Sequence, residues 1–563
     1  MTGNRKRRSR TAAVIDMTSD DAQIVAHQVA SHRITKKTKK IYAGKLNKWA
    51  SYFTDKFPLL ISESTNSDGD VIVSVDVERL EVEHVNSFLG QETKDAIEVQ
   101  NTDLEPGTTE FLDFAESRTV YAYQTISGHV SALKDAYKDA GVAISPDIKK
   151  CTDEFLQGYK KIIADLKAQG KYKMDEGKSH IRFAGFVQLI KLFSQYSPYN
   201  AVNYLKRAFE IGIFCVLFIV LCWNLAQRSE TVANIHLEHM HWVGDALCVR
   251  IPKSKNDQAG DKSDADDDGK HVYANPSNPL ICPISNLAVY FFTTPRTCNK
   301  LFEGSNQQAR YGVALRGLLS SLCEHAKTVL QAICVAVTEI GTHSFRKGAG
   351  TYALSFCGGY QLSDVFLRIG WSLGNVQDRY IFQSPGGDQC LGRVLAGLSP
   401  NDGNFAILPP HFNQADLAEI TDEDWCEIYP QYLTLPHGFK GVMPFLLATL
   451  FYHETFYRQT LHSNHPLFLC PVFQCRNPKF LRLKQKIYCE INHCVQTGLI
   501  ATGIPPFLQL TVRLKAFEEQ QRLANADIMA AIQALRERMP QDVSECLRMN
   551  SQVEGSAVQR VRY

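Results

Sequence analysis

The apolar run from Ile211 to Trp223 constrains the fold more than any other feature of this sequence. Its 13 residues fall short of the roughly 18 to 20 that cross a bilayer, so we expect no membrane partner. A helix over Ala208 to Leu225 has no polar face, and such a helix must be covered on all sides. The chain has 563 residues, enough for several domains. We therefore predict a large core around this helix.

Helical periodicity dominates the rest of the chain, and the predicted class is mainly α. Residues 22–57 have apolar residues at helical spacing on one side and lysines on the other, which predicts a basic amphipathic helix; the apolar residues are Ile34, Tyr42, Leu46, Trp49 and Phe53. Further helices are predicted at Val120 to Lys138 and Asp153 to Ala168, and helical periodicity returns after Pro283. Short alternating segments at 235–239, 247–251 and 272–274 predict a small antiparallel sheet. The expected fold is a helical N-terminal domain, an α+β domain with this sheet, and a helical C-terminal appendage.

Charges of opposite sign are segregated near the N-terminus. Residues 1–60 contain 13 Lys and Arg against four Asp and Glu, whereas residues 61–118 contain three against 15. The basic clusters are Arg5, Lys6, Arg7 and Arg8, followed by Lys36, Lys37, Lys39 and Lys40. Such clusters neutralise DNA phosphates or serve as nuclear-localisation signals, so we predict double-stranded DNA as a partner and the nucleus as the location. The alternative is a solvated tail that binds nothing.

Turn signals and composition divide the chain into segments. The predicted segments are a basic tail (1–20), a helical DNA-clamping domain (21–177) with an acidic insertion (61–118), an α+β domain (178–400), a helical domain (401–505), a coiled-coil helix (506–545) and a tail (546–563). Between Glu63 and Thr109 we expect irregular structure with one short strand near Val71 to Val75.

The last predicted helix, Leu508 to Met539, has apolar residues at heptad spacing. They are Leu510, Leu514, Phe517, Ala524, Ile528, Ala531 and Leu535, with Gln521 in the same series. This spacing is typical of a coiled coil, which would allow self-association. The polar Gln521 and the two alanines leave open an ordinary helix that packs on its own chain.

Four strings between 224 and 380 contain the residues that suggest chemistry. They are 224–230 (Asn-Leu-Ala-Gln-Arg-Ser-Glu), 253–258 (Lys-Ser-Lys-Asn-Asp-Gln), 341–348 (Gly-Thr-His-Ser-Phe-Arg-Lys-Gly) and 370–380 (Gly-Trp-Ser-Leu-Gly-Asn-Val-Gln-Asp-Arg-Tyr). Arg228 follows the apolar helix, where it either caps a helix or binds an anion. His343 and Arg346, three residues apart, lie on one side of a helical turn and can reach the same oxygen-rich group.

Taken together, the four strings resemble the tyrosine recombinases of the phage-integrase superfamily, most closely the Crypton-type recombinases of eukaryotic mobile elements. The resemblance implies a helical core-binding domain that clamps DNA and an α+β catalytic domain. It also implies integration and excision of a mobile element, a tetramer acting on two duplexes, and no metal or other cofactor.

The resemblance implies a role for each matching residue. Tyr380 would be the nucleophile, Arg228 and Arg346 would bind the scissile phosphate, and Lys255 would be a general acid. His343 would handle the proton of the nucleophile, and Trp371 stands where the family has His or Trp. Lys253 is the alternative to Lys255. Two guanidiniums can stabilise the negative charge of a phosphoryl-transfer transition state without a metal ion.

Two other functions remain open. One is a non-catalytic DNA-binding protein derived from a captured recombinase, although such a protein would not need the complete set of Arg, Lys, His and Tyr. The other is a type IB topoisomerase, which uses similar tyrosine chemistry. The His-x-x-Arg string and the spacing from Trp371 to Tyr380 favour a recombinase.

Overall fold

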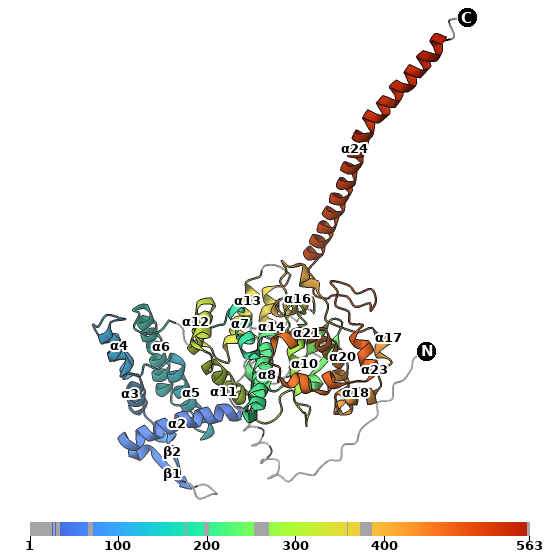
Figure 1. Ribbon diagram of the computed structural model, residues 1–563. Helices are drawn as coiled ribbons and strands as arrows, with labels where there is room; N and C mark the ends of the chain where they lie inside the picture. Colours follow the sequence, from blue (N-terminus) through green and yellow to red (C-terminus); the bar gives the residue numbers. More distant parts are fainter. Residues whose placement is uncertain are drawn as a thin grey trace, which may run out of the picture. The chain divides into compact units, whose positions relative to one another are not determined.

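The computed structural model describes residues 34–65, 71–174, 177–195, 202–252, 269–356, 359–371 and 385–559, together with Val25 and Val29. The chain divides into two compact units, Met1–Glu176 and Gly177–Tyr563. Both consist mainly of helices, as predicted, and each contains a small antiparallel sheet, of which only the one in the second unit was predicted (Figure 1). Within the described ranges, no helix is long and apolar enough to cross a bilayer.

The first unit is a set of helices with one hairpin. Its elements are α2 (Lys36–Lys56), η1 (Pro58–Leu60), β1 (Ile61–Thr65), β2 (Val71–Val75), η2 (Val77–Arg79), α3 (Val82–Asn101), α4 (Thr109–Glu116), α5 (Tyr123–Asp139) and α6 (Pro146–Ala168). Strands β1 and β2 pair antiparallel, with Ile61 opposite Val75. Helix α2 packs on α5, and α3 packs on α6.

Between Glu63 and Thr109 the strand expected near Val71 to Val75 is present as β2, but the irregular structure expected over Val82–Asn101 is wrong. Helix α3 occupies 20 of these residues. Its buried residues are Val85, Phe88, Leu89, Thr93, Ala96 and Val99, which recur at helical spacing. Because the segment 61–118 is rich in Asp and Glu, its composition indicated irregular structure although these buried residues form a stripe with helical spacing. The stripe joins the core of the first unit, where Phe88 stacks on Trp49 of α2 with ring centroids 3.8 Å apart.

The second unit begins with helices around a three-stranded sheet. These elements are α7 (Phe183–Ser194), α8 (Val202–Asn224), α9 (Ser229–Ala233), η3 (Leu237–His239), β3 (Met240–Val243), β4 (Ala246–Val249), β5 (Lys270–Tyr273), α10 (Pro283–Thr293), α11 (Gln307–Ser320), α12 (Glu324–Ile333), η4 (Val337–Glu339), α13 (Ser344–Leu354), α14 (Leu362–Ile369) and α16 (Pro385–Leu395). The order β3-β4-β5 is antiparallel throughout.

Shorter helices and one very long helix follow in the same unit. They are η5 (Gly403–Ala406), α17 (Gln414–Leu417), α18 (Asp422–Ile428), η6 (Tyr432–Thr434), α19 (His437–Lys440), α20 (Met443–Tyr452), α21 (Glu454–Thr460), η7 (Pro466–Leu469), α22 (Pro471–Gln474), α23 (Pro478–Lys484) and α24 (Pro506–Gln559).

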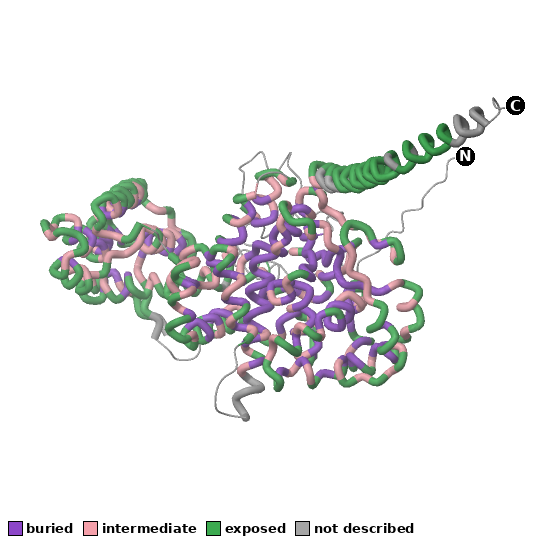
Figure 2. The backbone as a smooth tube through the Cα atoms, turned by 45° about the horizontal axis from the view of Figure 1, so that its top comes forward, coloured by how far each residue is buried: buried purple, intermediate pink, exposed green. Residues whose placement is uncertain are grey.

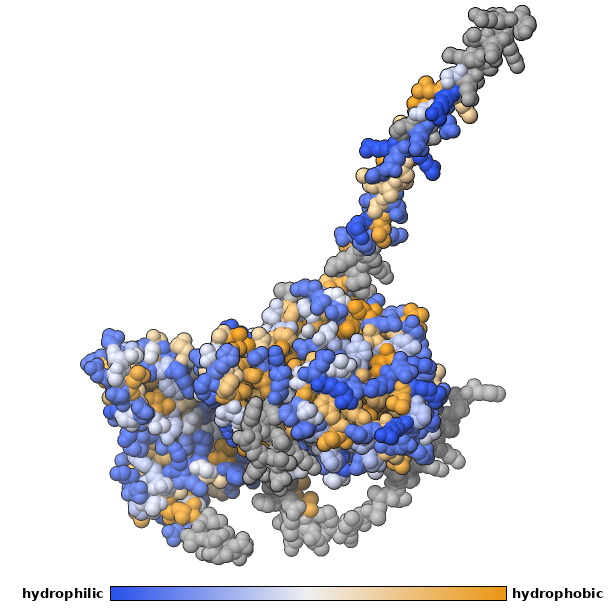
Figure 3. Space-filling model, viewed as in Figure 1, coloured by the Kyte–Doolittle hydropathy of each residue, from blue (hydrophilic) through white to orange (hydrophobic). Residues whose placement is uncertain are grey.

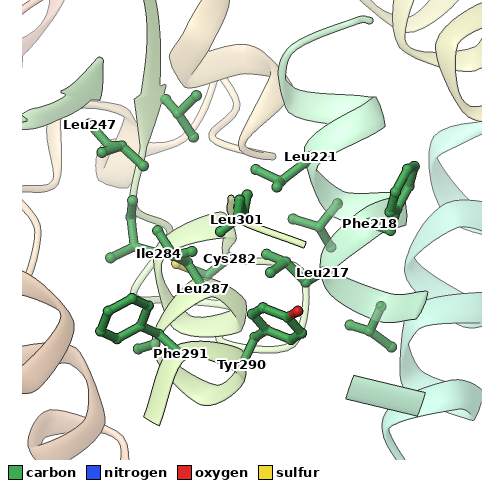
Figure 4. Packing of buried hydrophobic residues seen from close by; sticks show 14 of the residues in the cluster. Leu217, Phe218, Leu221, Leu247, Cys282, Ile284, Leu287, Tyr290, Phe291 and Leu301 are labelled. Carbon is green, nitrogen blue, oxygen red and sulfur yellow. The ribbon is translucent and has the colours of Figure 1, made fainter. Parts of the chain in front are cut away.

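Helix α8 is the centre of the core, as its sequence predicts. Every residue from Phe214 to Trp223 is buried, and α8 packs against α7, α10, α11 and α13. Figure 4 shows Leu217 and Leu221 of α8 facing side chains of α10 such as Leu287. Side chains from α18 to α23 join the same core, where Tyr429 stacks on Phe291 of α10. The domain boundaries predicted at 400 and 505 stay predictions.

The sheet lies close to where the sequence placed it, with one correction. The second and third predicted strands correspond to β4 and β5. The first predicted strand, 235–239, is wrong because residues 237–239 form η3 and the strand begins at Met240. The His239 ring accepts a hydrogen bond from the backbone N–H of His236, and this local contact favours the turn over an extended strand.

Candidate functional site

Arg346 is the third residue of α13, and main-chain carbonyls from two other segments hold its guanidinium. Its Nε donates to the carbonyl oxygen of Ala226 at 3.2 Å, and its Nη2 donates to that of Ile369 at 2.6 Å. Ala226 lies in the turn after α8, and Ile369 ends α14. The half-buried side chain is therefore fixed where three segments meet.

Arg228 lies beside Arg346, at the N-cap position of α9. Burial and the neighbouring charge of Arg228 lower the pKa of Arg346 to about 10. Burial also lowers the pKa of Arg228, an effect that Glu230 opposes. Among the described residues, neither arginine forms an ion pair with a carboxylate. Two adjacent guanidiniums without such a partner are suited to bind an oxyanion such as a phosphate.

The turn between α8 and α9 has an uncommon backbone conformation. Ala226 has a φ of 51°, in the left-handed region that residues other than glycine seldom adopt. This conformation costs about 1 kcal/mol and persists only where surrounding contacts enforce it. Here the Ala226 carbonyl accepts from Arg346, and Arg228 follows two residues later. The strained turn thus places both arginines.

A buried polar network around Arg368 holds the turn between α8 and α9 in place. The Arg368 carbonyl accepts from Gln227 Nε2 at 2.7 Å and from Lys270 Nζ at 2.9 Å. The Arg368 guanidinium donates to the carbonyls of Asn224 and His271 and pairs with Asp388. Burial alone would raise the pKa of Asp388, but the charge of Arg368 and the hydrogen bond from His271 hold it well below its usual range. The network ties α8, β5, α14 and α16 together.

Two glycines shape the wall of the site next to Trp371. Gly370 ends α14 with a φ of 74°, and the backbone N–H of Trp371 turns back to the carbonyl of Phe366. A Cβ on Gly350 of α13 would lie 2.8 Å from Ile369 Cδ1 and 3.8 Å from the Trp371 ring. The absence of a side chain at Gly350 therefore lets Ile369 approach α13. The Trp371 side chain is 40% exposed.

The structure brings together only part of the predicted catalytic set. Arg228 is close enough to Arg346 for its charge to act on it. Trp371 lies two residues after Ile369, whose carbonyl accepts a hydrogen bond from Arg346. His343 is the exposed N-cap residue of α13, three residues before Arg346. The described residues do not include Tyr380, Lys255 or its alternative Lys253.

The predicted basic helix is present as α2 in the first unit. Trp49 and Phe53 are fully buried on one side, whereas the side chains of Lys37, Lys39 and Lys40 are exposed. Lys36 begins the helix, but its side chain is not among those described, and Arg5, Lys6, Arg7 and Arg8 also fall outside the described residues. The helix thus presents a basic end to solvent, as its periodicity predicts.

Comparison with models of known protein families gives no match for this chain, and comparison with curated proteins finds no relative.

Sequence reasoning missed the residues that position the arginines. Gln227 stands inside one of the four strings, but Arg368 and Asp388 are separated by 20 residues, and Lys270 begins a strand. An Arg and an Asp at such a distance are normally read as surface residues, and only the burial of the pair reveals its role. In the described part of the chain, no three His, Cys, Asp or Glu side chains are grouped to hold a metal ion.

Proposed function

We propose that the chain is a tyrosine recombinase that cuts and rejoins double-stranded DNA through a phosphotyrosine intermediate. The observation that carries the proposal is the Arg346 guanidinium, which two backbone carbonyls hold within reach of the charge of Arg228. A protein that only binds DNA gains little from placing two like charges within electrostatic reach of each other in a partly buried position. A scissile phosphate, whose two non-bridging oxygens gain charge during transfer, uses both arginines.

The proposed reaction conserves bonds at each step. The Tyr380 oxygen attacks phosphorus, the P–O5′ bond breaks, and a 3′-phosphotyrosine forms while Lys255 gives a proton to the departing 5′-oxygen. His343 takes the proton of the tyrosine hydroxyl. In the second step a 5′-hydroxyl attacks the phosphotyrosine and releases Tyr380. Because each step exchanges one phosphoester for another, the reaction needs no ATP. On two duplexes, four protomers would exchange strands in this way, in the nucleus, for integration and excision.

Covalent trapping of DNA tests the proposal. Duplexes from both flanks of the coding region, each nicked next to a candidate scissile phosphate, are incubated with the full chain. We expect an SDS-resistant protein–DNA adduct whose nucleotide maps to the peptide containing Tyr380. Tyr380→Phe should abolish the adduct and change DNA affinity by no more than a few fold. The matched control is Tyr452→Phe, an exposed tyrosine outside the site, which should retain the adduct.

The same assay separates the alternatives. Adducts that persist in Tyr380→Phe contradict the assigned nucleophile. DNA binding without any adduct, on substrates that cover both flanks, favours the non-catalytic DNA-binding protein. Relaxation of supercoiled plasmid of any sequence, without exchange between duplexes, favours the topoisomerase.

The proposal also predicts cleavage in excess EDTA. The two arginines supply the positive charge that metal ions provide in metal-dependent phosphoryl transfer. Adduct formation should therefore proceed at an unchanged rate after chelation. A strict requirement for a divalent ion in the chemical step would contradict this expectation.

A further inference from the structure

Helix α24 exposes a long row of apolar side chains. It has 54 residues, about 80 Å at 1.5 Å per residue. Every side chain described from Leu514 to Ser551 is exposed, so the helix is drawn green along this length in Figure 2. An isolated helix with exposed apolar residues is only marginally stable in water, because most helical stability comes from packing an apolar face. A partner that covers this face would therefore stabilise the helix.

Apolar residues of α24 recur along one seam, which Gln521 and Asp542 interrupt. The described members are Leu510, Leu514, Phe517, Gln521, Ala524, Ile528, Ile532, Leu535, Met539, Cys546 and Met549, and apolar atoms recur along the helix in Figure 3. From Leu510 to Met539 each step is four or three residues, as in a coiled coil, and Asp542 occupies the position between Met539 and Cys546. One step of four in place of three, from Ile528 to Ile532, is a stutter that locally unwinds a coiled coil without interrupting its seam.

We infer that α24 pairs with α24 of a second copy of this chain, in parallel and in register. A heptad seam matches itself, so no other sequence is required to cover it. The net charge does not oppose this pairing, because residues 506–559 contain six Lys and Arg against seven Asp and Glu, but parallel pairing in register places the two Asp542 residues opposite each other. Because α24 has nearly equal numbers of acidic and basic residues, it has no net charge that would attract a strongly acidic or strongly basic helix.

Gln521 decides between parallel and antiparallel pairing. In a parallel dimer, the two Gln521 amides meet in the seam and can satisfy each other, each having both a donor and an acceptor. An antiparallel pairing over Leu510 to Met549 places Gln521 against Arg538 and Met539, where its amide oxygen can accept from Arg538 but its amide NH2 has no acceptor of comparable strength. A single polar residue in the seam also fixes the register.

The base of α24 is anchored to the sheet and to α16. The Thr502 Oγ1 donates to Asp245 Oδ1 at 2.6 Å, and Arg393 Nε donates to the Thr502 carbonyl at 2.6 Å. Arg393 and Asp245 form an ion pair that is completely buried. A Cβ on Gly503 would meet the backbone of Gln389 and Cys390 within 2.7 Å, so this segment lies directly on α16. Parallel pairing therefore also brings together the α16 helices of the two copies.

Cysteine crosslinking of the full chain tests the register. Cys546 lies in the seam and is exposed in one chain, so two copies should crosslink through it under mild oxidation. Cys546→Ser should abolish this covalent dimer. The matched control, Cys323→Ser, removes an exposed cysteine on the globular part and should retain it. A dimer that never crosslinks through Cys546 would overturn the parallel, in-register arrangement.

Sedimentation at micromolar concentration tests the pairing itself. We expect the mass of two chains, and the mass of one chain after the double substitution Ile528→Asp and Leu535→Asp. Met529→Asp changes an equally exposed residue outside the seam and should leave the dimer intact. A wild-type monomer would overturn the inference.

These measurements do not depend on the proposed chemistry, because neither reads DNA cleavage. Deletion after Pro505 removes α24 but keeps Thr502 and the arginine pair, so formation of the Tyr380 adduct should remain detectable in the monomeric protein.

Discussion

At the scale of single residues, the candidate site depends on where two guanidiniums are held. Arg346 gives one nitrogen to each of two carbonyls from different segments, which only a planar, forked side chain can do. Its remaining donors are available for a phosphate. The ammonium group of lysine has neither this geometry nor the reach to keep both carbonyl contacts.

Arg346→Lys should therefore lower the rate of adduct formation by at least about 100-fold, equivalent to about 3 kcal/mol of transition-state stabilisation. Single-turnover formation of the covalent adduct measures this, and thermal unfolding checks that the fold is retained. Arg316→Lys, at an exposed position on α11, is the control and should react at the wild-type rate. Wild-type cleavage by Arg346→Lys would contradict the role of Arg346.

Gly348 on α13 offers a prediction about stability. A Cβ at this position would collide with the Ile181 carbonyl and lie 2.9 Å from the Trp223 ring, so backbone must move. We expect Gly348→Ala to lower the free energy of unfolding by about 1–3 kcal/mol, measured by urea denaturation. Gly158→Ala, inside α6 with no atom near its added Cβ, should instead stabilise the protein by about 0.5–1 kcal/mol. A neutral Gly348→Ala would show that α13 can shift freely.

At the scale of elements, the sequence predicted best where one apolar pattern was sufficient. Helix α8 has no polar face and is central, and α2 has one apolar and one basic side, as predicted. Helix α3 was missed because the acidic composition of the whole segment 61–118 was given more weight than the helical spacing of the buried residues. Strand β3 was misplaced because a contact between two histidine residues forms η3. Arg228 and Arg346 could be predicted, but Arg368 and Asp388 could not, since their pairing depends on tertiary folding.

Helix α2 provides a prediction about DNA binding. If the exposed Lys37, Lys39 and Lys40 each neutralise one phosphate, replacing all three with Gln should reduce the salt dependence of DNA affinity by about 3 in the slope of log K against log salt. Fluorescence anisotropy at several salt concentrations measures this slope. The matched control replaces Lys149, Lys150 and Lys160 of α6, which are equally exposed. An equal reduction in both triple variants would indicate non-specific attraction and no role for α2.

At the scale of the whole molecule, three buried histidines limit stability in acid. Burial is the main cause that lowers the pKa of His129, in the first unit, and of His453 and His465, in the second unit, from 6.5 to about 4. Below pH 6.5 the unfolded chain binds protons at these positions, whereas the folded chain does not. Folding stability therefore falls as the pH decreases from about 6.5 to about 4.

Each histidine should contribute up to about 3 kcal/mol to this loss. Hydrogen exchange of α5 and α20 at pH 7 and pH 5 reports the two units separately, after correction for the intrinsic pH dependence of exchange. His129→Gln should reduce the pH dependence in α5 and leave that of α20 unchanged. Equal protection at both pH values in the wild-type protein would contradict the prediction.

The buried pair of Arg393 and Asp245 also has a consequence during synthesis. Asp245 precedes its partner Thr502 by 257 residues, and at the usual 5 to 20 residues per second the ribosome needs roughly 13 to 50 seconds to cover that interval. During this time the Asp245 carboxylate, in the turn between β3 and β4, lacks its hydrogen bonds from Thr502. The second unit therefore completes its fold only after residue 502 has emerged, and a nascent chain halted earlier is expected to depend on chaperones.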